Sequence, residues 1–223
     1  MNHRAKKAAR TKLALLDAAL GLITSRPFEE VAVAEICEKA EVSYATFFNY
    51  FEKKEYLLLY FIQLWSVEAA HVALKAGGGR AGIEALFEFT AQGCVSGPEI
   101  MEEIISFMAR SRNLARLNIH PLSEIEKRIR FPYITDFDGL PESGLESLLP
   151  PLINHAKANG ELLQGIDLGD VMLGLATLFL GLPVALSARR MQGLAEAYRR
   201  QLAILWNGFN TQSDRQSIGR ISK

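Results

Sequence analysis

The hydrophobic residues of this chain recur every three or four positions, which is the spacing of amphipathic helices. A first stripe consists of Leu13, Leu16, Leu20 and Ile23. A second stripe consists of Val33, Ile36, Cys37 and Ala40. Ser43 is a suitable N-cap for a third short helix, which carries Phe47, Phe48 and Phe51. The pattern predicts three short N-terminal helices, with a tight turn at Glu41 between the second and the third.

The rest of the chain continues the helical pattern. A longer amphipathic helix is predicted from Glu55 to Lys75, before a run of glycines. Further helices are predicted at residues 81–95, 98–113, 121–130, 145–160, 168–190 and 193–209. Residues 133–147 contain proline, glycine and several acids, and we expect them to form a loop. Because no stretch alternates as a half-buried strand does, we predict an all-α protein.

Charge is concentrated at the N-terminus. The chain has 25 basic and 25 acidic residues and no net charge. Residues 1–12 nevertheless carry no acid, and their basic residues are Arg4, Lys6, Lys7, Arg10 and Lys12. Such a segment is either a solvated flexible terminus or an arm that contacts phosphates, and the neighbouring helices favour the second interpretation.

Three short helices with a tight turn before the third are the parts of a helix-turn-helix, whose second motif helix enters the major groove. The candidate DNA-binding residues are Ser43, Tyr44, Ala45, Thr46, Asn49, Tyr50 and Lys54. We expect Thr46 and Asn49 to face base edges, with Tyr44 close by. Lys54, Tyr50 and the basic arm are expected to contact phosphates, whereas Phe47 and Phe51 should face inward.

Residues 11–57 resemble the tetracycline-repressor-like (TetR) family. The segments that carry the resemblance are LLDAAL at 15–20, VAEIC at 33–37 and VSYATFFNYFEKKE at 42–55. The resemblance implies a homodimer formed through the last two helices, which binds palindromic double-stranded operator DNA and a small-molecule effector. It also implies a transcriptional repressor, released from its operator by a small, largely apolar molecule.

The expected organisation follows from the helices and the resemblance together. Residues 1–10 would be a basic flexible arm and residues 11–57 the helix-turn-helix DNA-binding domain. Residues 58–209 would be a helical ligand-binding and dimerisation domain, and residues 210–223 a polar tail. In the dimer, residues 168–190 and 193–209 are expected to meet their copies, the latter through a stripe of Leu194, Tyr198, Leu202 and Leu205.

The motif departs from the family pattern at three positions. Glu41 stands where glycine is usual, so we expect this residue at positive φ. Ala32 replaces a capping threonine, and Phe48 replaces a tyrosine that reaches phosphate. These departures support an alternative function, a helix-turn-helix scaffold that acts through protein contacts and has weak or lost DNA binding.

Aromatic and methionine residues of the second half are candidates for an effector pocket, although such residues often only fill a core. The candidate ligand-binding residues are Trp65, Phe87, Phe107, Met108, Met172 and Phe179, with Phe89 beside them. Possible polar anchors are Glu68, Cys94, Glu102 and Glu103.

Other classes of function lack support in the sequence. His71, His120 and His155 have no metal-ligand spacing, and no catalytic cluster or phosphate loop is present, so we expect no metal, no cofactor and no enzyme. Cys37 and Cys94 show no redox spacing, and no signal peptide is evident, as in a cytoplasmic protein. The uncharged run at residues 171–188 borders on the length of a membrane span, but we interpret it as an oligomer interface rather than a membrane contact.

Overall fold

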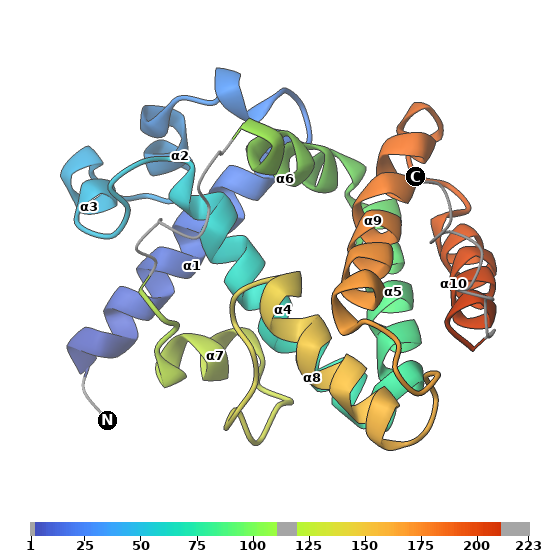
Figure 1. Ribbon diagram of the computed structural model, residues 1–223. Helices are drawn as coiled ribbons and strands as arrows, with labels where there is room; N and C mark the ends of the chain where they lie inside the picture. Colours follow the sequence, from blue (N-terminus) through green and yellow to red (C-terminus); the bar gives the residue numbers. More distant parts are fainter. Residues whose placement is uncertain (1–2, 111–119, 211–223) are drawn as a thin grey trace, which may run out of the picture.

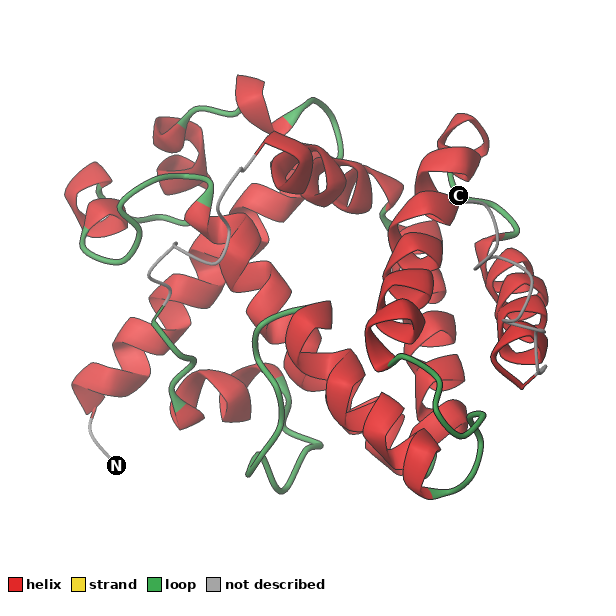
Figure 2. Ribbon diagram, viewed as in Figure 1, coloured by secondary structure: helices red, strands yellow, loops and turns green. Residues whose placement is uncertain are grey.

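The computed structural model describes residues 3–110 and 120–210, and these residues form helices and no strand (Figure 2). The N-terminal part contains α1 (His3–Ile23), the short 3-10 helix η1 (Phe28–Glu30), α2 (Val33–Lys39) and α3 (Tyr44–Phe48). The larger part contains α4 (Tyr56–Lys75), α5 (Gly79–Ser96), α6 (Pro98–Arg110), α7 (Glu124–Arg130), α8 (Leu145–Ala158), α9 (Leu168–Leu186), η3 (Ser187–Arg189) and α10 (Leu194–Asn210). The predicted all-α class is confirmed.

The two ends of the molecule are built from the two ends of the chain. Helices α2 and α3 lie at one end and α9 and α10 at the other, with α4 running between them (Figure 1). Helix α4 is apolar on most of its surface and packs against α1, α5 and α8. A helix that is hydrophobic on most sides must be covered by protein, which explains its central position.

The basic N-terminal segment differs from its prediction. Helix α1 begins at His3, so most of residues 1–10 are helical rather than a flexible arm. The segment contains alanine, lysine and arginine, which favour helix, and neither glycine nor proline before Gly21. The polar tail lies outside the described residues, apart from its first residue.

The turn between α2 and α3 has the geometry that the sequence predicts. Glu41 has φ 54°, and the Val42 N–H donates to the Cys37 carbonyl across the turn. Ala32, at the start of α2, offers no side-chain acceptor, but its own N–H donates to the Glu35 carboxylate at 2.9 Å. The helix therefore keeps one half of a capping box despite the missing threonine.

We expect Glu41→Gly to stabilise the protein by less than about 1 kcal/mol. Glycine removes the clash of a Cβ atom at positive φ, and its larger unfolded-state entropy offsets part of this gain. Thermal unfolding measures the effect, with Glu38→Gly inside α2 as the contrasting variant, which should lower the melting temperature. A lower melting temperature for Glu41→Gly would show that the turn is not strained by its side chain.

A buried ion pair joins α1 to the larger part of the molecule. The Glu126 side chain on α7 is buried, and its Oε1 lies 2.5 Å from the Lys12 Nζ on α1. The same oxygen accepts a hydrogen bond from the Tyr60 hydroxyl on α4 at 2.8 Å. Burial opposes ionisation of Glu126, but hydrogen bonds from Lys12 and Ser123 outweigh it and hold the pKa of the carboxyl below its usual value.

Helices α9 and α10 leave an apolar surface uncovered. By length and composition, α4 and residues 168–189 are apolar enough to cross a membrane, but 61% of the α4 window is buried and only 22% of the second. Leu173 and Val184 are exposed three turns apart on α9, as is Ile204 on α10. The stripe of α10 that was predicted to face a second copy does not lie on this surface. Its Leu194, Tyr198 and Leu202 are buried within the single chain, where α10 packs on α5 and α9.

Candidate DNA-binding surface and effector cavity

Helix α3 presents the predicted groove residues on its outer side. The Ser43 hydroxyl caps the helix by accepting from the Thr46 N–H at 3.1 Å. Phe47 and Phe51 are buried, as the sequence predicts, and this orientation turns the opposite side of α3 to solvent. Exposed on or beside that helix are Ser43, Tyr44, Ala45, Phe48 and Asn49, with Thr46 and Tyr50 half-buried.

Lys54 has a position that sequence reasoning missed. Its ammonium donates to the main-chain carbonyls of Phe28, Glu29 and Val31 at 2.8, 2.8 and 3.0 Å. These three bonds use all the donors of the group and hold η1 against the start of α4. The partners lie more than 20 residues away in the chain, so no local pattern indicates them. A phosphate contact by Lys54 therefore stays a prediction.

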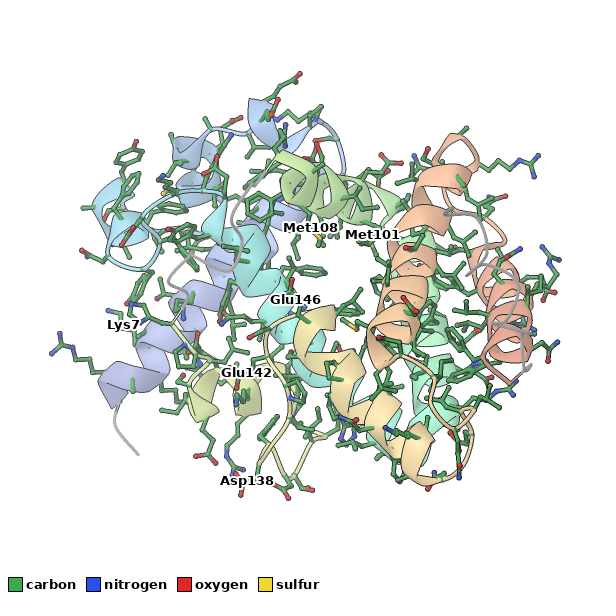
Figure 3. The ribbon with its side chains drawn as sticks, viewed as in Figure 1. Lys7, Met101, Met108, Asp138, Glu142 and Glu146 are labelled. Atoms are coloured by element: carbon green, nitrogen blue, oxygen red, sulfur yellow. The ribbon has the colours of Figure 1, made fainter. Side chains whose placement is uncertain are left out.

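A basic hollow lies beside the groove helix. It has a volume of about 410 Å³ and is lined by His3, Lys6, Lys7, Arg10, Thr11, Ala14, Ala40 and Val42. Figure 3 shows Lys7 on α1, near the end where the chain begins. Because Val42 directly precedes the N-cap of α3, the cationic side chains of α1 stand next to the predicted groove surface, where DNA phosphates would run.

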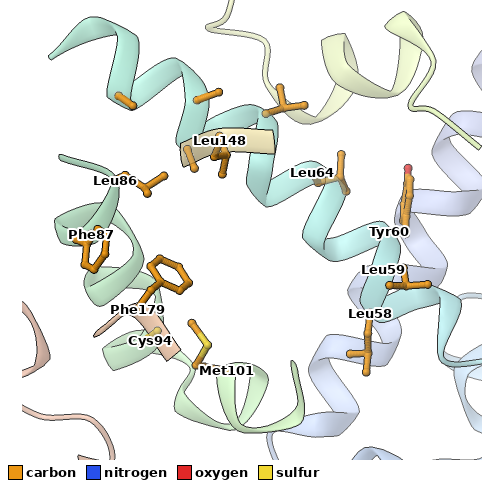
Figure 4. Packing of buried hydrophobic residues seen from close by; sticks show 14 of the residues in the cluster. Leu58, Leu59, Tyr60, Leu64, Leu86, Phe87, Cys94, Met101, Leu148 and Phe179 are labelled. Atoms are coloured by element: carbon orange, nitrogen blue, oxygen red, sulfur yellow. The ribbon is translucent and has the colours of Figure 1, made fainter. Parts of the chain in front are cut away.

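A larger cavity, of about 640 Å³, lies between α4, α5, α6, α9 and the start of α8. Of the predicted ligand-binding residues, Trp65, Met108 and Phe179 line it, as does Phe89. The other three predicted residues do not line the cavity. Phe87 is fully buried and packs edge-on against Phe179 and Tyr198. Phe107 belongs to the buried core, and Met172 is half-buried on α9. Helical spacing identifies a buried face but not which of its residues borders a space. Figure 4 shows Cys94, Met101 and Phe179 approaching one another from α5, α6 and α9.

Of the four predicted polar anchors, one lines the cavity and three do not. Cys94 lines the cavity, and burial raises the pKa of its thiol to about 12, so it stays protonated at neutral pH. Glu103 instead accepts a hydrogen bond from the Phe28 N–H at 3.0 Å. Glu68 accepts from the Tyr133 hydroxyl, and Glu102 is exposed. No group of three potential metal ligands is present among the described residues.

Helix α6 contacts both the cavity and the N-terminal part of the molecule. Its Ile100, Met101, Ile104 and Met108 line the cavity. Its Glu103 holds the Phe28 N–H of η1, and its Arg110 forms an ion pair with Glu29 of the same short helix. Helix η1 connects α1 to α2, so α6 bears directly on the unit that carries α3.

Comparison with known proteins gives a consistent result. Residues 15–61 match the model of the bacterial regulatory proteins of the tetR family. No curated protein matches the chain closely enough to be counted as a relative.

Three solved structures share the fold at low sequence identity. FadR of Thermus thermophilus, a TetR-family transcriptional repressor in complex with lauroyl-CoA, is 23% identical with a TM-score of 0.59, over 92% of this chain and 97% of that one. A putative tetR-family transcription regulator from Shewanella sp. PV-4 is 19% identical with a TM-score of 0.56, over 89% and 97%. A TetR transcriptional regulator from Rhodococcus sp. RHA1 is 13% identical with a TM-score of 0.54, over 90% and 99%. The helix-turn-helix segment therefore matches the tetR family model, and the chain shares its fold with three regulators of that family.

Proposed function

We propose that this protein is a cytoplasmic transcriptional repressor that leaves its operator when a small, largely apolar molecule binds. The observation that carries the proposal is the 640 Å³ cavity, whose wall α6 also holds η1 of the DNA-binding part. TetR-family regulators bind operator DNA, dimerise and bind effectors, which supports the same function here. The structural neighbour that binds lauroyl-CoA is a repressor, and this supports the direction of control.

DNA recognition in this proposal uses α3 and the basic hollow. Thr46 and Asn49 would face base edges in the major groove, with Ser43, Tyr44 and Ala45 beside them. Tyr50 and the cationic side chains of α1 would contact phosphates, and their binding should weaken steeply with salt. A duplex affinity that does not respond to salt would instead favour the alternative function, a scaffold that acts through protein contacts. Phe48 and the Lys54 ammonium, whose donors are already used within the protein, support that alternative.

We expect Asn49→Ala to weaken operator binding by about 1–3 kcal/mol and to relax the preference at one base pair. The amide of asparagine fits the donor and acceptor pair of adenine, and Asn49 is exposed at the end of α3. Selection from a randomised duplex library, followed by fluorescence anisotropy, measures both effects. Asn159→Ala at the end of α8 is the matched control and should leave both unchanged. An unaltered preferred sequence in Asn49→Ala would remove this residue from base readout.

Dimerisation in this proposal uses the apolar surface of α9 and α10. Leu173, Val184 and Ile204 would meet their copies across a two-fold axis, because so large an exposed apolar surface is unusual for a soluble monomer. The two α3 helices would then lie about 34–36 Å apart, which suits a palindromic operator.

The proposed coupling runs through α6 as well as α4. A ligand in the cavity contacts the Met101 and Met108 side of α6, while Glu103 on the same helix holds the Phe28 N–H. A displacement of α6 would therefore move η1 and, through it, α2 and α3. A ligand achieves this only by its different affinities for the two positions of the helix.

We expect Glu103→Ala to uncouple the two sites. In the unaltered protein, saturating effector should lower operator affinity by about 5–150-fold, the usual range of allosteric coupling. In Glu103→Ala this factor should shrink towards one, while affinity for the effector alone remains. The measurement is operator binding with and without the small molecule that co-purifies with the protein, identified by mass spectrometry. Glu102→Ala, at the neighbouring exposed position, is the control, and full coupling in Glu103→Ala would exclude this route.

A further inference from the structure

Three polar side chains that line the cavity, those of Gln63, Thr90 and Ser96, donate hydrogen bonds within the protein. The Thr90 hydroxyl donates to the Leu86 carbonyl at 2.8 Å, and the Ser96 hydroxyl to the Gln92 carbonyl at 2.9 Å. The Gln63 side chain is 6% exposed, and its amide NH₂ donates to the His120 carbonyl at 3.1 Å. The amide oxygen of Gln63 has no donor among the hydrogen bonds that the described residues make, so an acceptor is left over.

The two charged residues in the described part of the lining are acidic. Glu142 and Glu146 border the cavity, and no lysine or arginine does so among the described residues. Glu142 is neutralised, because it forms an ion pair with Lys127 and accepts from the Leu122 N–H at 3.0 Å. Glu146 is exposed and has no ion-pair partner within the described part of the chain. Figure 3 shows Glu146 across the cavity from Met101 and Met108.

We infer that the effector is an elongated apolar molecule with a cationic, hydrogen-bond-donating head, such as an alkylammonium ion. This inference rests on the proposed function and specifies its ligand. The apolar part would lie against the wall that contains Met101 and Phe179, and the head against Glu146 and the Gln63 oxygen. An ammonium supplies the donors that these two groups lack and the charge that opposes the carboxylate.

The same surroundings disfavour an anionic ligand. A fatty acid or an acyl-CoA would bring a carboxylate or phosphates to a lining in which Glu146 is the one unpaired charge among the described residues, and like charges at close range repel. The neighbour FadR binds lauroyl-CoA, but an identity of 23% shows a shared fold and does not carry the ligand over to this chain. We therefore expect the ligand chemistry of this chain to differ from that of FadR.

The test compares ligands that share one twelve-carbon chain and differ in the head group. Dodecylamine, which is protonated at pH 7, dodecanol, laurate and lauroyl-CoA are titrated into the full-length protein by calorimetry below their micelle concentrations. Dodecylamine should bind about tenfold more tightly than laurate or lauroyl-CoA, with dodecanol between them. Glu146→Gln should abolish most of this preference, and Glu146→Lys should reverse it. Glu102→Gln removes a carboxylate outside the lining and should leave the preference unchanged.

A second variant locates the binding site. Gly93 lines the cavity, and a Cβ built on it meets no atom within 4 Å. Gly93→Phe should therefore fill the cavity without a backbone clash and abolish binding of dodecylamine. Undiminished binding in Gly93→Phe would overturn the site.

The possible failures are distinguishable. If laurate or lauroyl-CoA binds as tightly as dodecylamine in the unaltered protein and loses binding in Gly93→Phe, the charge preference is wrong and the sensing function stands. If none of the four binds, dodecanol included, the inference is wrong and the proposed apolar effector site loses its support as well.

Discussion

Replacement of Glu126 by alanine should lower the free energy of unfolding by about 3–5 kcal/mol, the cost of leaving one partner of a buried ion pair alone. Lys12 would keep its charge in the space between α1 and α7 without a counter-charge, and the Tyr60 hydroxyl would lose its acceptor. For a chain of this length the melting temperature should fall by roughly 10 °C. Urea unfolding at equal protein concentration gives the free energy, and equal concentration matters because a dimer gains stability with concentration.

The control for this prediction lies on the same helix. Glu124→Ala removes an exposed carboxylate that pairs with Arg128 one turn away, and it should cost less than about 1 kcal/mol. The double variant Lys12→Ala with Glu126→Ala should lose less than the sum of the two single losses, because the two residues share one interaction. Similar losses of unfolding free energy in Glu124→Ala and Glu126→Ala would show that the buried pair of Lys12 and Glu126 stabilises the fold no more than an exposed ion pair does.

Acid should weaken the same contact. The folded protein holds the pKa of Glu126 below the usual carboxyl value of 4.5, so its ionised form stabilises the fold above that pH. This contribution is lost as the pH falls through the lowered pKa of the folded state. The difference in stability between the unaltered protein and Glu126→Ala should therefore shrink below about pH 4.

Replacement of Leu173 by glutamate should convert the proposed dimer to monomer at micromolar concentration and lower operator affinity at least about 100-fold. The Leu173 side chain is 66% exposed on the apolar surface of α9. A two-fold axis would duplicate the change and bury two unpaired carboxylates, each at a cost of several kcal/mol. Loss of the dimer also separates the two groove helices, so each half-site would have to be bound alone.

A second exposed leucine provides the control. Leu74, at the end of α4, is 59% exposed and does not belong to α9 or α10, so Leu74→Glu should remain dimeric. Analytical ultracentrifugation measures the mass of both variants, and anisotropy their operator affinity. If Leu173→Glu remains dimeric, the interface lies elsewhere on the molecule. If the unaltered protein is monomeric, the proposed interface does not exist.

Prediction of the candidate site from sequence succeeded where neighbours in the chain decide the structure. The N-cap at Ser43, the inward Phe47 and the positive φ of Glu41 each depend on residues within a few positions. The cavity was predicted less well: Trp65, Met108 and Phe179 border it, but Phe87 does not. Both kinds of residue occupy buried helix faces, and only the packing of several helices decides where a space remains.

The sequence by itself determined the helices, the turn and the helix-turn-helix, because helical spacing, capping and turn conformation arise from interactions within one or two turns. The tertiary structure alone decided which distant groups meet. It brought Lys54 to the carbonyls of η1, Lys12 to Glu126, and Glu103 to the Phe28 N–H. It also buried the Tyr198 stripe of α10 inside the chain and left the Leu173 face of α9 exposed. An amphipathic pattern states that a face must be covered, and the arrangement of the other helices determines what covers it.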